Sequence, residues 1–319
     1  MKKGIHILPI LWLVFGCVFG VASYCGYRLL LNASNNAKQL THQVQTQTDT
    51  NKQRDTRNKQ AVFDPTTIIP VTPEAYAEAQ LQVETIVDQW GIGALYIPSA
   101  KIQTKVLAGM ANQNLMVGVG TYDPQQQFGQ GNAVLLAHNI VQGGGALGNV
   151  LATHQGDVIY ATDFTNVYEY VTRNSGIVDQ SKGELLDKPK DEEPPVITLL
   201  RCEGGLNTSN RAVVQGTFHK SYPAEAADHA VKQGLGLERA VTEHSDQATN
   251  QTARQQAQQE PANQPTTATK AFQAKQPLYS TLEHVAIRCF GLLQAHPILL
   301  AISFLAGLWV LLCLEVKTT

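Results

Sequence analysis

Long apolar stretches stand near both ends of the 319-residue chain, and the sequence between them alternates between polar and mixed segments. Residues 5–27 contain no Asp, Glu, Lys or Arg. As a helix they would extend roughly 35 Å, which exceeds a hydrocarbon core of about 30 Å. Residues 297–314 also lack a formal charge, and apolar sequence continues upstream of them. The pattern therefore predicts two transmembrane helices.

The first span carries an orientation signal. Lys2 and Lys3 precede it, which favours an N-terminus in the cytoplasm. Two spans then place both termini in the cytoplasm and the intervening sequence on the extracellular face of the cell membrane. A signal peptide cleaved near Val21-Ala22-Ser23 is one alternative, and a peripheral apolar hairpin is another. Apolar residues continue through Leu31, which favours a retained anchor.

Composition changes three times between the spans. Residues 32–60 are rich in Asn, Gln, Thr and Lys and predict a solvated polar stalk, whereas 61–220 carry enough apolar sequence for a sizeable core. The resulting domain prediction is a cytoplasmic tip and anchor at 1–31, a stalk at 32–60, a folded domain at 61–220, an Ala-, Gln- and Thr-rich linker at 221–277 with one helix near 224–241, and an amphipathic segment, second span and short tail at 278–319.

The folded domain shows one helical pattern followed by strand patterns. Thr72 can cap a helix, Pro73 suits its first position, and apolar residues recur at roughly helical spacing as far as Val87. Short apolar runs separated by turn residues follow at 93–98, 115–119, 133–137, 157–161, 167–172, 196–200 and 211–217. This spacing predicts a mainly β domain, closed into a barrel or folded as a sandwich.

Charge and cysteine usage narrow the function. The formal net charge of −2 offers no argument for a nucleic-acid partner. The histidines and cysteines show neither C-x-x-C nor H-x-x-x-H spacing, so we expect no zinc and no cofactor. Four of the five cysteines lie in or beside the apolar ends, and only Cys202 falls in the folded domain. A solitary thiol facing an oxidising compartment is a candidate nucleophile.

The sequence also contains the further side chains that acyl transfer by Cys202 would require. A thiol attacks as its thiolate, the leaving amine needs a proton donor, and the developing oxyanion needs hydrogen-bond donors or positive charge. His138 and Arg211 supply these two functions, and each lies at or near the end of a predicted strand. Spacing alone leaves open that the histidine is structural, the thiol an inert core residue and the arginine solvated.

Around these residues the sequence resembles the sortases, membrane-anchored cysteine transpeptidases that attach proteins to the walls of Gram-positive bacteria. The resemblance covers about residues 74–220 and is greatest to the class A housekeeping type. The matching segments are Thr198-Leu199-Leu200-Arg201-Cys202, Arg211-Ala212-Val213-Val214-Gln215-Gly216, Leu136-Ala137-His138-Asn139, Tyr96-Ile97-Pro98-Ser99-Ala100-Lys101-Ile102 and Gly129-Gln130-Gly131-Asn132. The fold implied is an eight-stranded β-barrel with short helices, here flanked by two transmembrane helices.

The resemblance also implies a reaction. Cys202 would attack the Thr–Gly carbonyl of an LPxTG-type sorting signal, His138 would act as general acid and base, and Arg211 would stabilise the oxyanion or the substrate backbone. Lipid II or another peptidoglycan amine would resolve the thioester, anchoring a surface protein to the cell wall. The expected substrate-binding residues are Thr198, Leu199, Arg201 and Ala137.

The sequence departs from the family pattern in three respects. Arg201 replaces the threonine usual before the cysteine, which would alter the pocket near the scissile bond. Ala137 replaces a common glycine before the histidine. Asn112-Gln113-Asn114 stands where some class A sortases carry calcium-binding carboxylates, so we expect no metal requirement.

Alternatives remain at this point. A C-terminal span is more usual in class C pilin-polymerising sortases, whose N-terminal lid carries an Asp-Pro-aromatic motif; Phe63-Asp64-Pro65 resembles it, but Thr66 replaces the aromatic residue. Outside the family stand a different cell-wall enzyme with a Cys/His pair and a non-enzymatic membrane-displayed β-domain. The cysteine-before-histidine order of papain-like enzymes and the Ser-His-Gly-Cys signature of L,D-transpeptidases are both absent.

Overall fold

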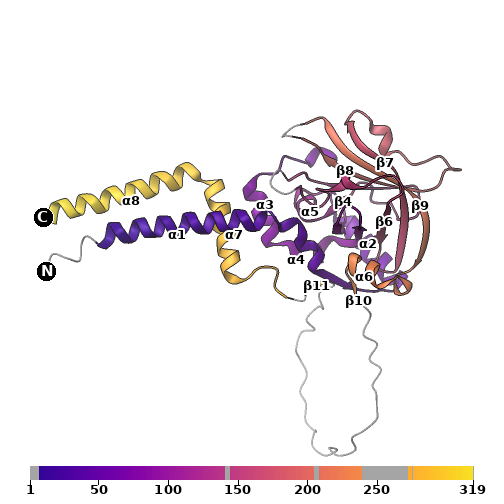
Figure 1. The fold of residues 1–319 in the computed structure, drawn as a ribbon, viewed down its shortest axis with the longest axis horizontal. Helices are drawn as coiled ribbons and strands as arrows, with labels where there is room; N and C mark the ends of the chain where they lie inside the picture. The colour runs from indigo at the N-terminus through magenta and orange to yellow at the C-terminus, as the bar shows by residue number, and fades with distance from the viewer. Residues whose placement is uncertain (1–6, 141–143, 205–207, 239–271, 275, 319) are drawn as a thin grey trace, which may run out of the picture.

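A closed eight-stranded barrel forms one end of the molecule (Figure 1). The computed structural model describes residues 7–140, 144–204, 208–238, 272–274 and 276–318. The order of strands around the barrel is β2-β3-β4-β5-β8-β9-β7-β6. The strands are β2 (Gly91–Ile97), β3 (Ile102–Leu107), β4 (Val119–Thr121), β5 (Asn132–Ala137), β6 (Val158–Thr162), β7 (Asn166–Asp179), β8 (Val196–Cys202) and β9 (Asn210–Pro223). The predicted β-barrel is confirmed.

Two strand predictions differ from the structure. The apolar run at 115–119 forms mostly α5 (Asn112–Val117), with β4 beginning at Val119. A run of five apolar residues cannot distinguish a strand from a buried helical turn by periodicity alone. Strand β3 was not predicted, although it pairs with β2 along its whole length.

The predicted leading helix is present as two helices. Thr72 caps α3 (Pro73–Leu81) by accepting a hydrogen bond from the Ala75 amide at 3.1 Å, as its position before Pro73 indicates. The helical pattern then continues as α4 (Val83–Trp90) after a break at Gln82.

Residues 32–60 are not a solvated stalk in the structure. They form a 3₁₀ helix, η1 (Ala33–Gln39), strand β1 (Leu40–Gln43) and helix α2 (Gln47–Gln60). Leu40 is only 1% exposed, and Arg57 of α2 donates to the carbonyls of Asp88 and Gly91. Few apolar residues mark this segment, and the strands that pair with β1 are distant in sequence.

Those partners form a small sheet outside the barrel, in the order β10-β1-β11. Strand β10 (Leu237–Glu238) is parallel to β1, and β11 (Phe272–Ala274) is antiparallel to it. The helix predicted near 224–241 is shorter, forming α6 (His229–Leu235). Residues 239–271 of the predicted linker lie outside the described residues.

The two predicted spans are long apolar helices that lie side by side and extend away from the barrel (Figure 1). They are α1 (Ile7–Leu30) and α8 (Pro297–Thr318), of which Pro297–Leu314 is apolar enough to cross a membrane. The Trp12 indole stacks on Phe304 and donates a 3.0 Å hydrogen bond to its carbonyl. Between α8 and the barrel, α7 (Thr281–Ala295) crosses α1 and packs against α3.

Candidate active site

Three neighbouring strands bring the predicted reactive residues to one end of the barrel. Strand β5 is parallel to β8, and β9 pairs with the other edge of β8 in antiparallel register. Cys202 is the last residue of β8 and lies directly opposite Arg211 of β9. Ala137 of β5 is aligned with Arg201, so His138 follows at the level of Cys202. Side chains at the same level of adjacent strands share a face.

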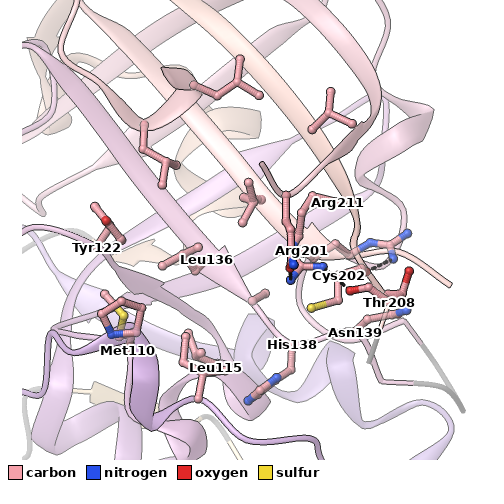
Figure 2. A pocket seen from close by; sticks show the side chains of 18 of the residues that line it. Met110, Leu115, Tyr122, Leu136, His138, Asn139, Arg201, Cys202, Thr208 and Arg211 are labelled. Carbon is pink, nitrogen blue, oxygen red and sulfur yellow. Dashed lines mark hydrogen bonds between the residues drawn. The ribbon is translucent and has the colours of Figure 1, made fainter. Parts of the chain in front are cut away.

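His138, Cys202 and Arg211 all line a cavity of about 450 Å³ (Figure 2). Its walls also include Leu136 and Leu200, two apolar residues of β5 and β8. Further lining residues come from α5, from the end of β7 and the β7–β8 connection, and from the segment before α3. They include Leu115, Val178, Leu185, Leu186, Pro65, Ile68, Ile69, Pro70 and Val71. The cavity is therefore largely apolar, with a thiol, an imidazole and a guanidinium at one end.

His138 is 6% exposed, and burial lowers the pKa of its imidazole to about 4. A neutral imidazole is therefore expected at pH 7. Its Nε2 lies 2.9 Å from Asn112 Oδ1, and in Figure 2 the ring extends away from the Cys202 sulfur. The Asn112 side chain also donates to Thr67 O and accepts from the Ile69 amide, both at 3.1 Å. Asn112 thus links the histidine to the segment that borders the cavity.

The Arg211 guanidinium is held at the rim of the cavity by neutral acceptors. It donates to the carbonyls of Thr208 and Asn210 at 2.7 and 2.9 Å, and to Gln180 Oε1 at 2.7 Å. These contacts orient the group without a bound carboxylate among the partners named. The Asp179 carboxylate also interacts electrostatically with Arg211. A positive charge held beside the thiol is suited to stabilising a developing anion.

The four predicted substrate-binding residues divide into two groups. Ala137 and Arg201 line the cavity. Leu199 does not, because it is fully buried in the barrel core. Thr198 lies on the same face of β8 as Cys202, but it is 0% exposed and donates to Asn132 Oδ1 at 2.8 Å. The β7–β8 connection covers Thr198, through the Leu185 carbonyl. We therefore correct the prediction for Thr198 and Leu199.

Several polar residues at this site were not predicted. Asn112 holds His138, Gln180 holds Arg211, and Glu203 forms an ion pair with Arg201. No motif marks Asn112 or Gln180, because each acts on a residue at least 26 positions away. Glu203 follows Cys202 directly in the sequence. Its negative charge, two residues from Arg201, was the one available signal for the ion pair.

The motif compared with a lid lies beside the cavity. Asp64 accepts hydrogen bonds from the amide and hydroxyl of Thr66, which lower the pKa of its carboxyl. Its carboxylate is thus used within its own turn, whereas Pro65 lines the cavity. A lid at this segment belongs to the class C alternative and stays a hypothesis.

The barrel is similar in sequence to sortase domains of known proteins. A family model of the sortase domain matches residues 95–219. Sortase A of Listeria monocytogenes is 30% identical over 130 residues, covering 41% of this chain and 57% of that protein. Sortase A of Bacillus anthracis is 35% identical over 126 residues, covering 39% and 58%. Among solved structures, Listeria monocytogenes sortase A has a TM-score of 0.41 and 27% identity, covering 46% of this chain and 97% of that one. The chain thus spans somewhat more than half the length of these two relatives.

Proposed function

The chain belongs to the sortase family of cysteine transpeptidases, and we propose that it cleaves an LPxTG-type sorting signal between Thr and Gly and transfers the acyl group to a peptidoglycan-precursor amine. One observation carries the proposal. Cys202 lies between His138 and Arg211 on three adjacent strands, and all three line one cavity. Such a protein would anchor surface proteins to the cell wall.

In the first half of the reaction, the neutral imidazole of His138 takes the proton of the Cys202 thiol. The thiolate then attacks the threonine carbonyl, and Arg211 donates hydrogen bonds to the oxyanion or to the substrate backbone. The imidazolium protonates the glycine amine as the C–N bond breaks, leaving a thioester on Cys202. Burial favours this last transfer, because it lowers the pKa of His138 and makes the imidazolium a ready acid.

In the second half, an acceptor amine attacks the thioester and His138 removes its excess proton. The C–S bond breaks and Cys202 leaves as the thiolate. The imidazolium then returns a proton to the thiolate, which restores the thiol and the neutral imidazole. The His138 ring bonds Asn112 in the resting structure, so the reaction requires the ring to turn toward the sulfur. Catalytic hydrogen bonds in unliganded enzymes are often long or poorly aligned and tighten only when substrate binds.

The two long apolar helices support attachment to the cell membrane. With both helices spanning, the barrel would lie on the extracellular face, where the expected partners are sorting-signal precursors and lipid II or another peptidoglycan amine. The same helices support the lipid bilayer as a further partner. The prediction of no metal or cofactor remains untested.

The test uses the 319-residue chain in detergent micelles, because segments on both sides of the barrel pack against it. It is incubated with an LPxTG-type peptide library and a glycine-based amine, and the products are identified by mass spectrometry. We expect Thr–Gly cleavage and joining of threonine to the amine, with a loss of kcat on the order of 10⁶-fold in Cys202→Ala. Undiminished cleavage by a folded Cys202→Ala variant would refute the proposal.

The C-terminal span favours a second candidate, a pilin-polymerising sortase of the class C type. The acceptor would then be a lysine side chain of another protein subunit rather than a cell-wall amine. Adding a lysine-containing peptide to the same reaction distinguishes the two. Preferential transfer to lysine would favour the pilin-polymerising function.

A further inference from the structure

Arg201, which stands where the family has a threonine, occupies a space formed by small neighbours. It is 7% exposed and lies at the end of β8, between Ala137 on β5 and Ala212 on β9. Alanine on both neighbouring strands leaves room for a guanidinium at the mouth of the barrel. Ala137 and Arg201 are thus direct neighbours on adjacent strands.

The guanidinium of Arg201 is occupied by the protein itself. Its Nε donates to Leu147 O at 3.0 Å, and its two terminal nitrogens donate to Gly148 O at 3.1 Å and Cys202 O at 2.9 Å. The terminal nitrogen that binds Cys202 O also lies 2.7 Å from Glu203 Oε2. Most of its N–H donors are thereby used. Such a group has little capacity left to bind substrate, despite lining the cavity.

These contacts join two segments that carry the reacting residues. Leu147 and Gly148 belong to the connection that follows His138, whereas the Cys202 carbonyl and Glu203 belong to the end of the nucleophile strand. Asn139 adds a second link, donating to Gly204 O at 3.3 Å. Glu203 offsets the charge of the buried guanidinium, which would otherwise be costly.

We propose that Arg201 is a positioning residue, which holds the segment after His138 against the end of β8 and so sets the geometry between the imidazole and the Cys202 thiol. This inference rests on the proposed function and assigns Arg201 a role other than substrate binding. A threonine hydroxyl is too short to reach both carbonyls of the connection and Glu203. Lysine carries the charge, but it lacks the planar fork that contacts several acceptors at once.

The test compares Arg201→Thr, Arg201→Lys and Glu203→Gln with wild type in the full chain. Arg173→Ala is the matched control, since Arg173 is an exposed strand arginine with a hydrogen bond to Gln215. The measurements are kcat and KM for the sorting peptide, hydrogen exchange at Leu147 and Gly148, and the pH dependence of Cys202 alkylation by iodoacetamide, followed on the Cys202 peptide by mass spectrometry.

We expect Arg201→Thr to lower kcat by about 10- to 100-fold while KM changes less than about threefold, since misplacement by about 1 Å can cost that much. Exchange at Leu147 and Gly148 should accelerate, and the alkylation profile should shift along the pH axis. Arg201→Lys should recover part of kcat, Glu203→Gln should have a smaller effect, and Arg173→Ala should match wild type.

A raised KM with unchanged kcat in Arg201→Thr would overturn the proposal, because it would make Arg201 a substrate-binding residue. Lowered kcat without faster exchange would overturn it as well. If Arg201→Thr does not fold, Glu203→Gln decides, and wild-type exchange and kcat in that variant would count against the proposal. If wild type cleaves no sorting peptide, the proposed function fails, whereas exchange and alkylation still test the positioning role.

Discussion

Two buried histidines have the same lowered pKa in very different surroundings. His138 lies at the cavity with Cys202, and His42 lies in the small sheet outside the barrel. Burial lowers the pKa of each imidazole to about 4. His42 stacks on Phe164 with ring centroids 3.9 Å apart and meets the edge of Phe272 at 4.6 Å. Its Nδ1 lies 2.6 Å from Gln43 O.

Burial alone therefore does not make a histidine a general base. Charges of Lys105 and Arg57 reinforce the lowering of the His42 pKa, and aromatic rings cover its ring. His138 has a thiol on the adjacent strand and lines the same cavity as that thiol. A lowered pKa is a functional indication only when a nucleophile and a cavity accompany it.

Replacing each of the two histidines in turn tests this difference most directly. We expect His138→Ala to lower kcat/KM for the sorting peptide by about 10²- to 10⁴-fold, the usual contribution of a general acid–base group. His42→Phe should leave kcat/KM unchanged, because a phenyl ring can keep the stack on Phe164. Steady-state kinetics of both variants, with circular dichroism as the folding control, checks this. Equal losses in both variants would remove the distinction.

Two arginines extend the same contrast. Arg211 lines the cavity, and Arg57 donates to backbone carbonyls in the region of His42. We expect Arg211→Gln to raise the activation barrier by about 2.7–4 kcal/mol, the range for losing an oxyanion-hole donor. Arg57→Gln should leave kcat unchanged and lower the free energy of unfolding by about 1–3 kcal/mol through unsatisfied buried groups. Turnover rates and thermal melts of the pair measure both effects.

Acid stability is where the two histidines should behave alike. An unfolded histidine has a pKa of about 6.5, so between that pH and about 4 the unfolded chain binds more protons than the folded one. The free energy of unfolding should therefore fall as pH decreases through this window, by up to about 3 kcal/mol for each buried ring. His42→Phe should abolish the contribution of His42 to this decrease in the free energy of unfolding.

Melting temperatures at pH 7 and pH 4.5, compared between wild type and His42→Phe, test this effect. The matched control is a substitution of an exposed histidine, His154→Gln, which should retain the full wild-type decrease. An identical decrease in wild type and His42→Phe would show that His42 is protonated in the folded protein over this range.

Some elements could be predicted because their signals are local. The cap and proline at Thr72-Pro73 begin a helix wherever they stand before a helical pattern, and a charge-free stretch of 5–27 is helical over most of its length. Strand β8 followed from its run of apolar residues, and its reactive end from the motif it carries. These predictions depended on neighbours within a few positions.

Other elements could not be predicted, because their partners are distant in the chain. Strand β1 is stable only against β10 and β11, which follow it by about 200 residues. The same holds for the burial of Thr198 beneath the β7–β8 connection, which removed it from the expected substrate-binding set. A polar segment carries no local record of a strand partner that tertiary packing supplies.

The sequence alone thus suffices to predict a thiol, an imidazole and a guanidinium at the ends of strands. It also predicts a membrane-spanning helix on each side of the domain that carries them. That His138 and Arg211 lie on either side of Cys202 follows from the strand order β5-β8-β9, which joins residues more than 60 positions apart. The hydrogen bonds from Arg201 to the carbonyls of Leu147 and Gly148 likewise depend on tertiary contact. The acceptors for the N–H groups of Arg201 include carbonyls of a segment distant in sequence. Only the folded structure can therefore distinguish a positioning arginine from a substrate-binding one.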